Sequence, residues 1–232
     1  MSKQAERAKE LLPAVMLTLL SMIQALALEF YWTQLVDSPF LFEGGWNAFV
    51  GWAQAVVVLW GILQVWVFYV SIVLRFSWLP SLEDALTPFF VGLLEFGMIE
   101  TMHPDTMGPW LLLMGGIFAL MVVTARRSMI RARREPANAY FFDHVEVPSW
   151  RDLKESIATV VILLTDGLIL CVWTSKGLTV FAIFVVIAAL TYQARQTVRY
   201  WLHSVTDESL EQHEDEGDKQ QREEVIGAVD RK

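Results

Sequence analysis

Long runs of apolar residues, interrupted by few charged side chains, occupy most of the first 200 positions. We place the predicted spans at residues 11–36, 46–74, 86–102, 109–125, 157–174 and 178–194. A helix rises about 1.5 Å per residue and the hydrocarbon core is about 30 Å thick, so about 20 apolar residues cross it. Lipid offers no hydrogen-bond partner to an exposed backbone, which favours helices. The pattern predicts an all-α, polytopic membrane bundle of six helices, arranged as three hairpins.

Basic residues lie on alternate connections between these spans. Thirteen Lys and Arg residues lie in the N-terminal segment, after the second and fourth spans, and after the sixth span, whereas the other connections carry only Lys176. Connections rich in Lys and Arg face the cytoplasm. We therefore expect both termini in the cytoplasm, which agrees with an even number of spans, and a plasma or inner membrane as the location.

The overall net charge of −8 is concentrated at the C-terminus. Residues 207–232 contain ten acids and four bases, which gives 4 − 10 = −6. A segment with so few apolar residues is expected to stay disordered. We predict a transmembrane domain at residues 1–205, with a cytoplasmic loop at 126–155, and a cytoplasmic tail at 206–232. The tail either only solubilises the chain or binds a cytoplasmic protein partner.

The N-terminal span has one feature of a secretory signal. The tripeptide Ala25-Leu26-Ala27 resembles a signal-peptidase site. However, the apolar run continues to Val36, and two acids dilute the basic N-terminal segment. We therefore expect the segment to remain as a transmembrane helix, with cleavage as the alternative.

Tryptophan is abundant, and its positions favour an aromatic belt. An amphipathic ring prefers the membrane–water interface. The tryptophans near predicted span ends are Trp32, Trp46, Trp78, Trp110, Trp150, Trp173 and Trp201.

Three acidic residues lie inside the apolar runs. Glu29, Glu95 and Asp166 occupy the first, third and fifth spans, which are the outward-going helices of the three hairpins. A charged group near the bilayer centre costs a few kcal/mol on insertion scales, so it should face the bundle interior or a hydrated cavity, or be protonated. Exchange between protonated and ionised forms is what a proton or cation relay requires. These acids are therefore the candidate ion or proton path.

Three more polar residues complete the predicted path: Glu100, His103 and Gln24. Glu100 and His103 are three residues apart near the outer boundary, where they can touch. A titrating His103 could control outer access, although a plain surface histidine is the simpler interpretation. Gln24 either extends the polar path or only hydrogen-bonds a neighbouring helix.

Glycines flank the acids, and two short segments repeat. Gly92 and Gly97 surround Glu95, and Gly167 follows Asp166, so the acids are expected at close helix–helix contacts. The segments Pro-Ser-Leu-Glu-Asp at residues 80–84 and Pro-Ser-Trp-Arg-Asp at 148–152 both predict a capping box before a span. They indicate either two ordinary caps or a repeated helical hairpin.

No recognised motif assigns a reaction or a cofactor. The chain lacks a phosphate-binding loop, a nucleophile elbow, metal-ligand spacing and a basic nucleic-acid groove, so we expect no cofactor, no metal and no nucleic acid. The hypothesis is a small proton- or cation-coupled transporter or channel, which we expect to form a homo-oligomer. The alternative is a non-transporting sensor, anchor or assembly subunit that acts through the cytoplasmic loop and tail. A third interpretation, a lipid-modifying enzyme, would use His103, Glu100 and Asp105 at the outer interface.

Overall fold

The computed structural model describes residues 3–76, 78 and 81–198. The chain divides into two compact units, residues 1–193 and 194–232, and the fold below is that of the first unit. The predicted tail and Trp201 lie outside the described residues. The elements are α1 (Lys3–Val36), η1 (Pro39–Leu41), α2 (Gly45–Arg75), α3 (Leu82–Glu100), η2 (Pro104–Thr106), α4 (Met107–Ala132), η3 (Pro136–Asn138), α5 (Ala139–His144) and α6 (Lys154–Val172), followed by a last helix, Lys176–Val198. No strand occurs among these residues, which confirms the all-α prediction.

Five helices are long and apolar enough to cross a membrane, as expected of a multi-pass membrane protein. They are Pro13–Val36, Gly45–Arg75, Pro104–Ala132, Lys154–Val172 and Lys176–Val198. The third predicted span corresponds to α3, which is 19 residues long but carries four acids. These acids, and not its length, set α3 apart from the other five helices.

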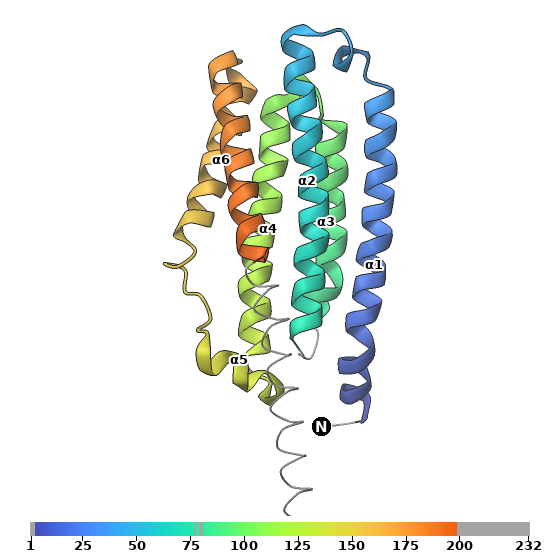
Figure 1. Ribbon diagram of the computed structural model, residues 1–232, viewed down its shortest axis with the longest axis vertical. Helices are drawn as coiled ribbons and strands as arrows, with labels where there is room; N and C mark the ends of the chain where they lie inside the picture. The colour runs from blue at the N-terminus through green and yellow to red at the C-terminus, as the bar shows by residue number, and fades with distance from the viewer. Residues whose placement is uncertain (1–2, 77, 79–80, 199–232) are drawn as a thin grey trace, which may run out of the picture. The chain divides into compact units, whose positions relative to one another are not determined.

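The long helices pack side by side in one bundle (Figure 1). Helix α4 packs against α6 on one side and against α3 on the other, while α1 packs against α2 and α3. One continuous apolar core joins these helices with the last helix, and it includes Leu20, Val58, Ile99, Trp110 and Ile183. Helix α3 therefore packs against three other helices, which gives its buried acids neighbours other than lipid.

The basic connection after α4 folds back onto one end of the bundle. Helix α4 continues to Ala132, so the start of the predicted loop, including Arg126, Arg127 and Arg131, is helical. Phe141 on α5 contacts Phe76 after α2, with ring centroids 5.0 Å apart. The Arg75 guanidinium lies 4.2 Å from the centre of the same Phe141 ring. An aromatic cluster thus fixes the connection between α4 and α6 to the ends of α2 and α4.

The two repeated segments each form the same kind of hydrogen bond, but the bond has a different role in each. The backbone N–H of Ser81 donates to Asp84 Oδ2, and that of Ser149 donates to Asp152 Oδ2, both at 2.8 Å. Before α3 this bond is part of a complete capping box. Before α6 it closes a turn, because the helix begins only at Lys154. The capping-box prediction is confirmed for the first segment and wrong for the second.

The aromatic belt also needs correction at two positions. Trp32, Trp150 and Trp173 are exposed, as a belt requires. Trp110 is fully buried and Trp78 is 4% exposed, so both belong to the protein interior. Trp78 is held by a hydrogen bond from its indole N–H to Asp84 at 3.4 Å.

Candidate functional site

A buried hydrogen-bonded pair joins α1 to α3. The side-chain amide of Gln24 donates to Glu95 Oε1 at 3.0 Å and to Oε2 at 2.9 Å. Both side chains are buried, with Glu95 1% exposed and Gln24 4% exposed. No cation contacts this carboxyl within the described residues. The structure therefore brings together two residues of the predicted path that are 71 positions apart in the chain.

Gly92 allows α3 to approach α1 closely enough for this pair to form. A Cβ atom at Gly92 would lie 2.6 Å from Cγ2 of Ile23, the residue beside Gln24. Such a distance is too short for any real Cβ contact, so a larger residue would push the two helices apart. The expectation that glycine places Glu95 at a close helix contact is confirmed here.

The surroundings of the Gln24–Glu95 pair are apolar. One turn of α3 to either side lie Val91 and Met98, which are 0% and 1% exposed. In such surroundings an ionised carboxyl loses its hydration without gaining a counter-ion, which is costly. Uptake of a proton or a cation would therefore stabilise the Glu95 carboxyl strongly.

Asp166 is a second buried acid, on α6, which packs closely against α4. It is 7% exposed, and its Oδ2 atom has no hydrogen-bond partner among the described residues. The next residue, Gly167, contributes to a very close helix contact: a Cβ atom at Gly108 of α4 would lie 2.6 Å from the Cys171 backbone nitrogen and 2.9 Å from the Gly167 carbonyl oxygen. The prediction that Asp166 faces protein at a glycine contact is confirmed.

Other polar atoms in the core also have unused hydrogen-bonding capacity. Gln54 on α2 is fully buried and donates to Met107 Sδ at 3.5 Å, while its Oε1 has no partner within the described part of the chain. Gln24 Oε1 and the indole nitrogen of Trp110 also have no hydrogen-bond partner among the described residues. Most buried polar atoms in proteins are paired, so these atoms mark the bundle interior as more polar than a purely structural core. Sequence reasoning did not find Trp110, because its position suggested an interface.

An ion-pair network at the basic end of the bundle was missed as a site. The guanidinium of Arg131 on α4 pairs with Asp84, and it also donates to Ser81 Oγ at 3.2 Å. Asp84 is only 4% exposed, whereas the neighbouring pair Arg127–Glu83, at 2.8 Å, is exposed on both sides. The sequence does contain a signal for this pair, because Asp84 and Arg131 lie at the same predicted membrane boundary.

Asp84 and Glu95 lie on the same buried face of α3. Eleven residues separate them, which corresponds to about 16 Å along the axis and about 20° around it. Thr87 lies between them and is 8% exposed. The phenol of Tyr69 on α2 lies in the same neighbourhood as Thr87, Asp84 and Arg131. Polar groups thus reach from the basic end of the bundle to Thr87, about 12 Å along α3 from Glu95.

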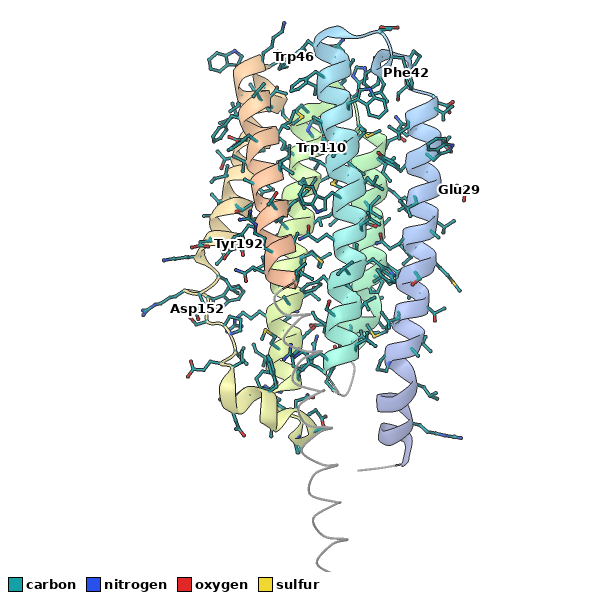
Figure 2. The ribbon with its side chains drawn as sticks, in the orientation of Figure 1. Glu29, Phe42, Trp46, Trp110, Asp152 and Tyr192 are labelled. Carbon is teal, nitrogen blue, oxygen red and sulfur yellow. The ribbon has the colours of Figure 1, made fainter. Side chains whose placement is uncertain are left out.

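The remaining predicted path residues are not part of these buried sites. Glu29 is exposed on α1, and Figure 2 shows it pointing away from the bundle. Glu100 is exposed at the end of α3. His103 is partly exposed, its Nδ1 accepts the backbone N–H of Asp105 at 3.2 Å, and its ring lies 4.7 Å from that of Phe40. The structure therefore separates the predicted path into a buried part and an exposed part.

The described residues hold no group of three or more His, Cys, Asp or Glu side chains that could bind a metal ion together. Comparison of the chain with protein-family models, with curated proteins and with solved structures gives no match. The Gln24–Glu95 pair is therefore the candidate functional site.

Proposed function

We propose that this protein is a small proton- or cation-coupled transporter or channel, and that Glu95 with Gln24 forms its intramembrane exchange site. The observation that carries the proposal is the fully buried Glu95 carboxyl, whose hydrogen-bond partner among the described residues is a single neutral amide. Ionisable groups inside membrane bundles are expensive and commonly belong to ion or proton routes.

The proposal includes six spans with both termini in the cytoplasm. Helix α3 is taken as the third span because α1, α2 and α4 all pack against it, and because its acids Asp84 and Glu95 have partners inside the bundle. The bundle end that carries Arg75, Arg127 and Arg131 is assigned to the cytoplasm by the positive-inside bias.

The Gln24 amide can accommodate both charge states of Glu95. When Glu95 is ionised, the amide nitrogen donates to its two oxygens, as observed. When Glu95 is protonated, rotation of the amide by half a turn turns Gln24 Oε1 toward the acid, where it accepts the carboxyl O–H. That oxygen has no partner among the described residues in the observed state. Rotation therefore breaks no other bond of Gln24 Oε1.

The same rotation supplies oxygen ligands for a cation. Glu95 would contribute two carboxylate oxygens and Gln24 one amide oxygen, which suits hard cations such as Na⁺. The polar groups at Asp84, Tyr69 and Thr87 form the cytoplasmic part of a route, and the buried Val91 separates Thr87 from Glu95 on α3. The Arg131–Asp84 pair then closes that route, and its opening would connect Glu95 to the cytoplasm.

The test is ion flux in proteoliposomes that contain the full-length protein. Proton flux is measured with an internal pH-sensitive dye, and Na⁺ and K⁺ gradients are imposed in turn. Glu95→Gln should reduce the flux to that of empty vesicles, because a neutral amide neither releases a proton nor balances a cation. Glu95→Asp keeps the charge but retracts it, so it should slow the flux and not abolish it.

Glu43→Gln is the matched control, since Glu43 is an exposed acid in the connection between α1 and α2. It should conduct as the wild type does. Wild-type flux in the Glu95→Gln protein, or no flux of any of the three ions in the wild type, would refute the proposal. Size-exclusion profiles of all variants are compared to exclude misfolding.

A sensor or assembly role is the second candidate, and the aromatic contact between the cytoplasmic loop and the bundle favours it. Because Phe141 packs on Phe76, a change in the position of α2 would reach the loop directly. This role predicts a stoichiometric cytoplasmic partner that is lost when residues 207–232 are deleted. It also predicts no ion flux in the proteoliposome experiment.

A further inference from the structure

The outward face of α1 presents polar groups at a depth where lipid cannot pair them. Glu29 lies seven residues before Val36, the end of the candidate span Pro13–Val36, which places it about 10 Å inside that end. Its carboxyl is exposed and has no hydrogen-bond or ion-pair partner among the described residues. A glutamate side chain is too short to reach the headgroups from there, unlike lysine or arginine.

The residues around Glu29 form a continuous exposed surface. We define the outward α1 face as Thr18, Met22, Ala25, Glu29 and Trp32, all of which are exposed. Their spacing alternates between four and three residues, which is the spacing that keeps one helix face against a partner helix. The opposite side of α1 is buried in the bundle, through residues such as Leu20, Gln24, Ala27, Tyr31 and Leu35.

Two of these residues have complementary hydrogen-bonding groups. The indole N–H of Trp32 is a donor, and the Trp32 side chain is 67% exposed with no bond to other described residues. The Glu29 carboxyl is an acceptor when ionised, and both donor and acceptor when protonated. Ala25 and Thr18 are small enough to let a second helix backbone come close to this face.

We propose that the outward α1 face is a homodimer interface, in which α1 of one copy packs in parallel against α1 of a second copy around a two-fold axis. A two-fold axis brings Glu29 of one copy next to Glu29 of its partner. Two adjacent carboxyls share one proton, because ionising both would place two negative charges side by side. The Trp32 indole, one turn away on the same face, donates to the same pair.

A second copy satisfies this face better than the other occupants. Lipid would leave the carboxyl unpaired, at a cost in free energy. A different protein would need its own polar group at the same depth, whereas the second copy supplies one by symmetry. Two-fold dimers are also the commonest form of protein self-association. This inference does not depend on the proposed transport activity, and it explains an acid that the Gln24–Glu95 site leaves unused.

The first test is disulfide cross-linking in lipid membranes. A Cys171→Ser background leaves the chain without cysteine, because Cys171 is its single cysteine. Ala25→Cys is then added, so that an oxidant joins two copies if their α1 helices cross near this residue. The control is Val161→Cys on α6, which is 56% exposed but lies on another face. Ala25→Cys should cross-link at least several times faster than Val161→Cys, and equal rates would overturn the proposal.

The second test measures the dimer equilibrium by energy transfer between labelled copies at decreasing protein-to-lipid ratios. Glu29→Leu removes the shared proton and should weaken dimerisation by about 3- to 20-fold, the range that single interhelical hydrogen bonds cover. Glu29→Gln keeps a donor and an acceptor and should stay within about threefold of the wild type, for the same reason. A wild type that is monomeric at all ratios, or a Glu29→Leu protein that dimerises as tightly as the wild type, would overturn the interface.

Discussion

Gln24 and Glu95 form a hydrogen-bonded pair across the α1–α3 contact, with donor–acceptor distances of 3.0 and 2.9 Å. The pair is buried and has an apolar environment on both sides along α3. Because neither residue is satisfied without the other, the two should be energetically coupled, and the coupling is measurable apart from any transport assay.

The stability of the purified protein should reveal this coupling. Gln24→Leu leaves a buried carboxyl without a partner and should destabilise the fold by about 1–3 kcal/mol. The double variant Gln24→Leu/Glu95→Leu removes both polar groups and should recover most of that loss. Unfolding in a detergent titration gives the free energies. Additive effects of Gln24→Leu and Glu95→Leu would show that the two side chains do not interact.

The close α4–α6 contact predicts a contrast between two glycines. A Cβ atom at Gly108 would collide with the backbone of α6, whereas at Gly61 no atom lies within 4 Å. Gly108→Ala should therefore destabilise the protein by about 1–3 kcal/mol. Gly61→Ala should be neutral or stabilise it by up to about 1 kcal/mol, because alanine is the better helix former. Thermal unfolding midpoints compare the two variants, and equal midpoints would contradict the packing described for Gly108.

The Arg131–Asp84 pair should contribute far more to stability than its exposed neighbour. Asp84→Asn leaves the largely buried Arg131 guanidinium with only the exposed Glu83 carboxylate, 3.6 Å away, as a counter-ion. We expect a loss of about 2–4 kcal/mol, somewhat below the range for fully buried pairs. The expected loss is smaller than for a fully buried pair because the Arg131 side chain is 21% exposed and water partly solvates it. Arg127→Gln breaks the exposed pair with Glu83 and should cost less than about 1 kcal/mol. The ranking of the two variants in the same unfolding assay is the measurement, and the opposite ranking would refute it.

The turn before α6 should show a pH dependence of its own. The backbone N–H of Ser149, and to a smaller extent its hydroxyl, donate hydrogen bonds to Asp152. These bonds hold the pKa of the Asp152 carboxyl below its ordinary value. A lowered folded-state pKa stabilises the turn above the unfolded pKa of about 3.9, and this stability is lost as the pH falls through the lower folded value. NMR titration of Asp152 should therefore give a midpoint below 3.9.

Ser149→Ala is the control for this titration, because it removes the hydroxyl but keeps the backbone N–H. Most of the pKa shift should remain, since the backbone bond is its larger cause. An ordinary midpoint for Asp152 in the wild type would show that the turn does not form in solution.

The long helices could be predicted from the sequence because each is a long apolar run. The buried partners could not be predicted as pairs. Gln24 and Glu95 were both candidates, but their meeting depends on the rotation of two helices about their axes. Apolar runs have no polar face that would reveal this rotation, since lipid and protein select similar side chains.

The same ambiguity explains the placement of Glu29 and Asp84. Glu29 resembles Glu95 in its local sequence, and both follow Leu and precede Phe. Nevertheless, one points out of the bundle and the other into it. Asp84 was recognised as a helix cap, but its pairing with Arg131 requires α4 to return beside the start of α3, which only the tertiary structure shows.

The acids of α3 have a consequence for how the chain is made. By composition alone, α3 is a poor substrate for the machinery that moves helices from the ribosome exit into lipid, because Asp84 and Glu95 both oppose partitioning. Gln24 has already been synthesised when α3 emerges, but Arg131 follows only later in the chain. In the proposed six-span arrangement, helix α3 should therefore wait beside α1 until α4 arrives, and enter the bilayer together with it. Its place in the membrane is then a property of the growing assembly and not of its own hydrophobicity.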